Sequence, residues 1–567
     1  MVIRKISLKL KAIALSALIL FVSQPLFGQS IIEDPKVEEF LNDEFYSDDD
    51  EITEDQDLSQ DVLDPLADSD EGNFINKEYQ KNFVMVIPKF RYDLNPHTAS
   101  YSSEAQILTG LYEGLFTYNP VNLEPENAIA KSYRISRDGK RWTFTLRDNA
   151  LFSDGTLITA QSFRDSWISL IENPNATYSS LLDVVEGAME YRLGQGSKED
   201  VGIYILDKFT LSVKLKSPVA HFSRLLCMPC FSAVQENLKA VSGPFMITSA
   251  NSECFIMEKN PLYYDAEKVP LEKITIVLSD DESENTYLMN TGAANWVDSS
   301  VNVQKLLIKD CAHVSAQYGT EYLFFKNQTG RVWQEADFRA ALLEAVPWDE
   351  IRGNGSFVNA PTFVYPLYGY PKVNGYSKSD ITEAMFIMKE ARKKHGISQD
   401  EKLVVKYAVD GGKRQADFAE ILKKAWEPLG VEMELVTVPN NEYLSKIDST
   451  DADLFYYCWI GDFADPLAFL ELFRTGSTLN CSRWSNPQFD ELLEKASLYT
   501  DENHFKYLAQ AEQVLLDSAE VITIIHPVSL NVIDLNQVGG WYINSFDIHP
   551  FKYLYLKPVK SKIKDVV

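Results

Sequence analysis

The chain is 567 residues long, and its composition, 45% hydrophobic and 12% aromatic, is that of a globular protein rather than a disordered one. Because a single hydrophobic core stops growing at about 250–300 residues, we expect at least two compact lobes. The formal net charge of −28 argues against a nucleic-acid-binding protein, which needs a basic surface to meet phosphates.

Residues 1–28 are typical of a signal peptide. A basic start is followed by an apolar run over 12–22. This run is shorter than the about 20 apolar residues that span a bilayer, which favours a cleaved signal peptide over a membrane anchor. No Cys directly follows the run, so the lipid-modified form of export has no attachment point. We therefore expect a soluble, periplasmic product.

Residues 29–72 form an acidic segment. Between Glu33 and Glu71 there are 18 acidic residues and a single basic one, Lys36. The few Phe and Leu residues in between cannot bury enough apolar surface to offset the entropy lost on ordering. We expect a disordered, solvated tail.

The globular part begins at Asn73, and helices and strands follow one another through its first half. Apolar residues recur at helical spacing over 102–115 and again over 160–171. Short alternating or apolar runs indicate strands at 83–87, 142–146, 210–215 and 273–278.

The second half gives the clearest prediction of architecture. A strand at 403–407 is followed by an amphipathic helix at 413–429, which ends at Gly430 as a left-handed cap. A strand at 431–436, a short helix at 441–446 and a strand at 454–459 complete the pattern. Such alternation predicts a parallel, doubly wound sheet, and ligands bind beyond the carboxyl ends of its strands. The loop that starts at Trp459-Ile-Gly-Asp462 is therefore the first candidate site.

Six cysteines are an even number in a compartment that permits disulfides, but the sequence does not determine their pairing. Cys227 and Cys230 have the spacing of redox motifs. The segment around them lacks the helical period that those motifs need, so a structural or free thiol pair is the favoured interpretation.

The sequence gives little support to an enzyme. Its seven histidines are scattered without metal-ligand spacing, and it has no nucleophile elbow, dinucleotide turn or phosphate loop. We expect no catalytic residues, no metal and no cofactor.

Five stretches match a known family in order along the chain. They are 107–167, which contains the ILTGLYEGLFTYNP and FSDGT motifs, VSGPFMI at 241–247, EKNPLYYD at 258–265, WIGDFADPLAFL at 459–470 and WSNPQFDELL at 484–493. Together they resemble the extracytoplasmic solute-binding proteins that serve ABC transporters for oligopeptides and dipeptides (family 5). The resemblance covers residues 73–556.

The resemblance implies a fold and a division into domains. The fold is α/β: a two-lobed periplasmic binding protein fold of the cluster C-like type II, with a small additional domain inserted in lobe one. Lobe one is expected at 73–113, 201–322 and 520–567, the inserted domain at 114–200, and lobe two at 323–519. Two crossings near Tyr322 and Glu520 then form a hinge.

The resemblance also implies a function. Such a receptor captures small peptides between its lobes as a monomer and delivers them to an ABC permease in the inner membrane. In the family the Asp of a Trp-x-x-Asp turn holds the amino group of the peptide, and Asp462 matches it. Trp459 matches the Trp beside the first peptide residues, and Gly461 lies in the same turn.

The residues themselves leave other roles open. Asp462 could cap its own turn, Trp459 could be a core residue that closes a strand, and Asp465, which precedes Pro466, is favoured as a turn or helix-start residue. The stretch 453–458 contains no Arg or Lys to meet a peptide carboxylate, and the nearest cation is Lys446.

Three alternatives compete with a peptide receptor. The same fold could bind another solute, such as a metal chelate, haem or a sugar, and loss of the role of Asp462 would favour this. The acidic tail favours a sensor or scaffold that has lost its transport partner. An enzyme is the last alternative.

Overall fold

A computed structural model describes residues 81–219, 221–235, 237–353, 358–463, 465–499 and 501–558. The predicted signal peptide and acidic tail lie outside these residues. Among the helices of the described part, none combines the length and the apolar character needed to cross a bilayer.

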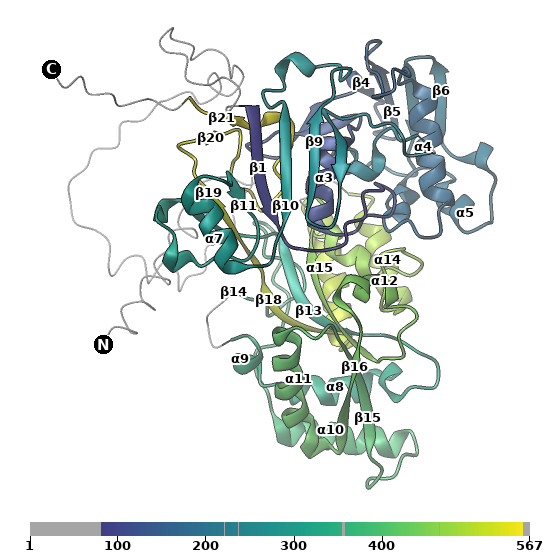
Figure 1. Cartoon of the computed structure of the whole chain (residues 1–567). Helices are drawn as coiled ribbons and strands as arrows, with labels where there is room; N and C mark the ends of the chain where they lie inside the picture. The colour runs from purple at the N-terminus through teal and green to yellow at the C-terminus, as the bar shows by residue number, and fades with distance from the viewer. Residues whose placement is uncertain are drawn as a thin grey trace, which may run out of the picture.

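Lobe one is built on a seven-stranded sheet in the order β12-β19-β11-β1-β10-β9-β8 (Figure 1). The central strand β1 is parallel to β10 and β11, and the outer pairs are antiparallel. The strands are β1 (Asn82–Ile87), β8 (Phe245–Ala250), β9 (Cys254–Lys259), β10 (Lys273–Leu278), β11 (Trp296–Val297), β12 (Ala312–Ala316) and β19 (Val528–Ile533).

Both faces of this sheet are covered. Phe83 and Met85 of β1 pack with Ile107 and Leu108 of helix α3 (Ser102–Leu111) on one face. Val86 belongs to a second cluster, against which α7 (Glu282–Thr291) packs. The alternation of side chains along β1 thus places the strand in the middle of a three-layered lobe.

The inserted domain is a four-stranded antiparallel sheet in the order β4-β5-β7-β6, covered on one face by α4 (Ala160–Glu172). The strands are β4 (Ala130–Ile135), β5 (Arg141–Leu146), β6 (Ile203–Asp207) and β7 (Thr210–Lys214). Smaller elements are β2 (Phe116–Tyr118), β3 (Pro125–Asn127) and α5 (Ala188–Arg192). The sheet therefore continues past residue 200, where the sequence placed the end of the domain.

Lobe two is built on a six-stranded sheet in the order β14-β18-β13-β17-β15-β16. Its strands are β13 (Gly319–Phe325), β14 (Val358–Asn359), β15 (Leu403–Val409), β16 (Val431–Thr437), β17 (Leu454–Ile460) and β18 (Val521–His526). The predicted parallel pairing is confirmed between β15 and β16. The sheet is mixed, however, because β17 pairs antiparallel with β13 over its whole length.

Helices cover both faces of this second sheet. One face packs against α8 (Ala336–Glu344), α10 (Ile381–Lys394) and α11 (Lys413–Trp426). The other packs against α13 (Leu467–Leu470), α14 (Pro487–Ala496) and α15 (Glu502–Asp517). The two-lobed α/β fold implied by the sequence is confirmed.

The chain crosses between the two sheets twice. One crossing is at residues 317–318, between β12 and β13, and the other is at Pro527, between β18 and β19. They lie side by side, because the Gln317 amide donates to the Pro527 carbonyl at 2.9 Å. Both differ from the expected positions near Tyr322 and Glu520, since β13 and β18 run almost up to the crossings.

The lobes also touch away from the crossings. The Ser180 hydroxyl of the inserted domain lies 2.9 Å from that of Thr478 in lobe two, and the Thr478 hydroxyl donates to the Thr177 carbonyl at 2.7 Å. On the lobe-one side, the His221 ring stacks on Phe463 with centroids 4.5 Å apart. The structure is therefore closed, with the two lobes in contact on both sides of the interface.

A buried ion pair anchors β18 to α8 in lobe two. The guanidinium of Arg339 lies 3.0 Å from the Glu520 carboxylate and donates to four backbone carbonyls, of residues 333, 334, 518 and 519. Both side chains are almost fully buried.

Replacing this cation should strongly destabilise the protein. Arg339→Met leaves the Glu520 carboxylate buried without its counter-charge, and we expect the free energy of unfolding to fall by about 3–5 kcal/mol in urea titrations. The double variant Arg339→Met/Glu520→Gln should recover part of the loss. A loss of less than about 1 kcal/mol for the single variant would contradict the assigned role of the pair.

Candidate functional site

The candidate site is the turn that follows β17. The Gly461 amide donates to the Tyr318 carbonyl at 2.7 Å, which continues the β13–β17 ladder one residue past the strand. A Cβ at position 461 would lie 2.7 Å from the Tyr318 ring, so only glycine fits there. This close approach places Asp462 at the boundary between the lobes.

Asp462 is a carboxylate without a partner. It makes no hydrogen bond or ion pair with another residue of the described ranges, and its side chain keeps only partial contact with solvent. Burial raises the pKa of Asp462 to about 8. A deeply placed carboxylate of this kind is stabilised most by a cation that a ligand brings.

Residues from three parts of the fold lie near enough to this carboxylate for its charge to act on them. Burial and, after it, the charge of Asp462 raise the pKa of Tyr178 in the inserted domain and of Cys230 in lobe one. After burial, the charge of Asp462 also contributes to raising the pKa of Tyr118 in β2 and of Tyr457 in β17. The hydroxyls of Tyr118, Tyr178 and Tyr457 make no hydrogen bond to another described residue, and phenol groups of this kind can donate to or accept from a polar ligand. We call these four residues and Asp462 the interlobe chamber.

Sequence reasoning found Asp462 but missed the rest of the chamber. Tyr118 lies in the motif-rich stretch that carries the resemblance, Cys230 was noted only for its spacing from Cys227, and Tyr178 lies in a segment without a distinctive pattern. They meet only because the inserted domain and lobe one close over lobe two, and no local periodicity reports that contact.

An open strand edge adjoins the chamber. In an antiparallel pair, alternate residues direct both backbone groups to the partner strand. Since Gly461 bonds to β13, residues 459 and 457 face β13 as well, and Cys458 and Ile460 direct their N–H and C=O groups to the opposite edge. On that edge β17 pairs with β15 only at Leu454, and Cys458 is exposed. An extended chain can add to this edge.

Trp459 and Asp465 hold the turn in place. The Trp459 side chain is 5% exposed, and its indole N–H donates to the Ala468 carbonyl at 2.9 Å. Asp465 accepts from the Leu467 amide at 2.9 Å and lies 2.8 Å from His504 Nε2, as expected of a residue that starts a helix. The direct contact of Trp459 with a ligand stays a prediction.

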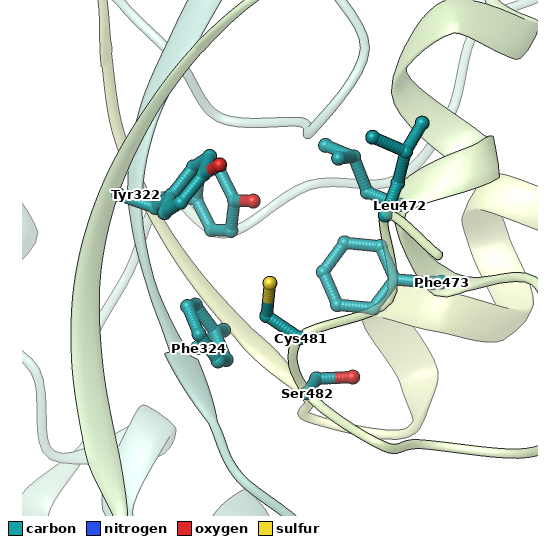
Figure 2. A pocket seen from close by; sticks show the side chains of 8 residues that line it. Tyr322, Phe324, Leu472, Phe473, Cys481 and Ser482 are labelled. Atoms are coloured by element: carbon teal, nitrogen blue, oxygen red, sulfur yellow. The ribbon is translucent and has the colours of Figure 1, made fainter. Parts of the chain in front are cut away.

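A small cavity with mostly aromatic walls lies on the face of the lobe-two sheet that packs against α13, α14 and α15 (Figure 2). It is lined by Tyr322, Phe324, Tyr457, Leu472, Phe473, Leu479, Cys481 and Ser482, and it offers about 10 Å³, room for about one water molecule. Figure 2 shows the Cys481 sulfur directed into the space between the rings of Tyr322 and Phe473. Tyr457 lines this cavity and also belongs to the interlobe chamber. A ligand side chain that reached Tyr457 on this face of the sheet would therefore meet a narrow, apolar surface.

Among the described residues, one group of three has the side chains of a metal site, namely Glu335, Asp337 and His395 on the surface of lobe two. The Lys394 ammonium lies 2.9 Å from the Asp337 carboxylate and already supplies a cation to it. The six cysteines are all free thiols in the described structure. Neither observation assigns chemistry to these groups.

The described turn, chamber and fold can be compared with known proteins. A family model described as bacterial extracellular solute-binding proteins, family 5 Middle, matches residues 124–480. The oligopeptide-binding protein OppA of Bacillus subtilis is 28% identical over 82% of this chain and 91% of its own length. The dipeptide-binding protein DppE of the same organism is 27% identical over 74% of this chain and 82% of its own.

Solved structures agree on the fold. The murein tripeptide binding protein MppA of Escherichia coli superposes with a TM-score of 0.75 at 24% identity, over 84% of this chain and 99% of its own. The unliganded open form of MppA gives 0.57 over 84% and 97%. Since the family model covers more than half of the sequence, the chain belongs to the bacterial extracellular solute-binding proteins of family 5.

Proposed function

We propose that the protein is a peptide receptor that captures oligopeptides between its lobes and delivers them to an ABC importer. The observation that carries the proposal is the unpartnered carboxylate of Asp462 beside the open edge of β17. The names of OppA and DppE, which describe oligopeptide and dipeptide binding, support the same ligand class.

The two features match what all peptides share. The amino terminus is a cation, and a charge-assisted bond to Asp462 contributes roughly 1.5–3 kcal/mol in such a desolvated place. The backbone of the peptide can form hydrogen bonds with the backbone groups of Cys458 and Ile460 as an added strand. These bonds do not depend on the side chains of the peptide. A receptor that uses these two contacts tolerates many sequences.

The wider setting belongs to the same proposal. Residues 1–28 direct export and are removed, and the mature chain acts in the periplasm as a monomer that presents its closed form to a permease in the inner membrane. The protein binds and releases its ligand without chemical change, so it is no enzyme and needs no cofactor.

The first test of the proposal is a double-mutant cycle on Asp462. Asp462→Asn removes the charge, and N-acetylation of the peptide removes the opposite charge. Each change should weaken binding by orders of magnitude, because it leaves the other charge buried and unpaired. The second change should then cost much less than the first. Calorimetry on the four combinations measures this, and fully additive penalties would reject the amino-terminal contact.

A second test uses the titration of Asp462. Its pKa of about 8 in the closed, ligand-free structure means that the group is mostly protonated there at pH 7, whereas the ion pair with an ammonium needs it ionised. Binding at pH 7 should therefore release close to one proton, and affinity should fall about tenfold per pH unit below 8. Calorimetry in buffers of different ionisation enthalpy measures the released proton, which Asp462→Asn should abolish.

The same titration predicts the stability of the ligand-free protein. When the pKa of a carboxyl group is higher in the folded state than its unfolded value of 3.8, the free energy of unfolding falls as the pH rises from about 4 to about 8. Asp462→Asn should therefore melt at a higher temperature than the wild type at about pH 8. A lower melting temperature would instead identify Asp462 as a cap of its own turn.

Closure of the lobes gives a third test. Ser180→Ala/Thr478→Val removes the hydroxyl contacts between the inserted domain and lobe two, each worth about 1 kcal/mol, so peptide affinity should fall several-fold. The control Thr291→Val/Ser445→Ala removes hydroxyl bonds within single lobes and should leave affinity unchanged. Small-angle scattering should show a more compact wild type with peptide than without. An unchanged radius of gyration would count against a receptor that closes.

A further inference from the structure

The inserted domain carries a basic face on a strongly acidic protein. Residues 131–147 contain six basic residues and one acidic residue, although the whole chain has a net charge of −28. Five of the cations lie on β4, on the start of β5 and in the turn between these strands: Lys131, Arg134, Arg137, Lys140 and Arg141. We call these five residues the basic face.

The cations of the basic face have no acidic partner in the described part of the chain. None of the five takes part in a salt bridge. Asp138, in the same turn, instead bonds the Ser136 hydroxyl and the Lys140 amide. On the neighbouring strand β7, Lys214 is paired with Glu186 at 2.6 Å. Unpaired cations thus cluster on β4, in the turn that follows it and at the start of β5, whereas Lys214 on β7 is paired.

Protection of a sheet edge explains only part of this pattern. β4 is an edge strand, and charges on such strands prevent unwanted pairing. Arg141, however, lies on β5, which is paired on both sides, and Arg137 lies in the turn. Two apolar side chains of β4 are also exposed, Tyr133 at 42% and Ile135 at 46%. Because successive residues of a strand point to opposite faces, these two side chains lie on the other face of the sheet from Arg134, and the Tyr133 ring stacks on Trp142. The basic face therefore offers positive charge without apolar contact from β4.

The chain itself contains a segment with the complementary character. Residues 33–71 hold 18 acidic residues and one basic residue, with Phe40, Phe45 and Tyr46 among the acids. The nine residues 72–80 join this segment to Lys81 and can extend over about 30 Å. Figure 1 shows β1, which begins at Asn82, in the same lobe as β4 and β5.

We propose that the acidic segment 33–71 docks on the basic face of its own molecule. A tethered segment acts at an effective concentration in the millimolar range, so even weak ion pairs are populated. The contact is made of many exposed pairs and is strongest at low ionic strength. The proposal does not depend on which ligand the lobes bind.

Zero-length cross-linking of the mature, full-length protein tests the proposal. A carbodiimide joins carboxylates to amines in contact, and we expect bonds within one molecule from acids of 33–71 to Lys131 and Lys140. In about 0.5 M NaCl, where the screening length is about 4 Å, their yield should fall about fivefold or more. Bonds to the lysines near the C-terminus (Lys560, Lys562, Lys564), bonds spread over all exposed lysines, or bonds only between molecules would overturn the proposal.

Matched charge reversals complete the test. Arg134→Glu/Arg137→Glu should reduce the cross-links to Lys131 and Lys140 about as much as salt does, because both arginines are exposed and belong to the basic face. Lys423→Glu/Lys424→Glu changes the net charge equally on the exposed side of α11 and should leave the yield unchanged. Equal loss in both variants would show a general charge effect and reject a specific docking face. Circular dichroism and melting curves establish that each variant is folded.

Discussion

The structure depends on Asp462, a carboxylate that is largely withdrawn from water and has no counter-charge among the described residues. Asp462 would gain several kcal/mol from any nearby Lys or Arg, yet the stretch before it has none and burial raises its pKa to about 8. Such a group lowers the stability of the empty closed state. In the peptide receptor proposed above, an entering ammonium recovers this energy, and the same residue then links the occupancy of the site to the position of the lobes.

The rest of the fold serves to hold this group at the interface. β13 and β18 lie in one sheet, and the strands that precede and follow them, β12 and β19, lie in the other, with the two crossings hydrogen-bonded to each other. A hinge made of two adjacent crossings allows rotation of the lobes and restricts sliding between them. The contacts of Ser180 with Thr478 and of His221 with Phe463 are few and small, which keeps closure reversible.

The sequence predicted local elements well because their patterns are local. The strand at 273–278 is found with the same bounds, and the helix from Lys413 ends before Gly430, whose φ of 73° needs the conformational freedom of glycine. The crossings were displaced by several residues because β13 is buried along its whole length and shows no change of pattern at the lobe boundary. The residues on which the charge of Asp462 acts could not be predicted, since they come from separate segments of the chain.

The distribution of charge along the chain bears on how the site around Asp462 selects its ligand. The net charge of −28 attracts cations from a distance, and residues 33–71 carry much of it, with 18 acidic residues and one basic residue. If that segment is held on the basic face of the inserted domain, its charges are neutralised there instead of competing with Asp462 for the amino terminus of a ligand. One desolvated carboxylate, rather than the surface as a whole, then discriminates between cationic and neutral ligands. At the exposed surface, salt screens most of the attraction between single charges, whereas at a site with little water the attraction to one charge remains strong.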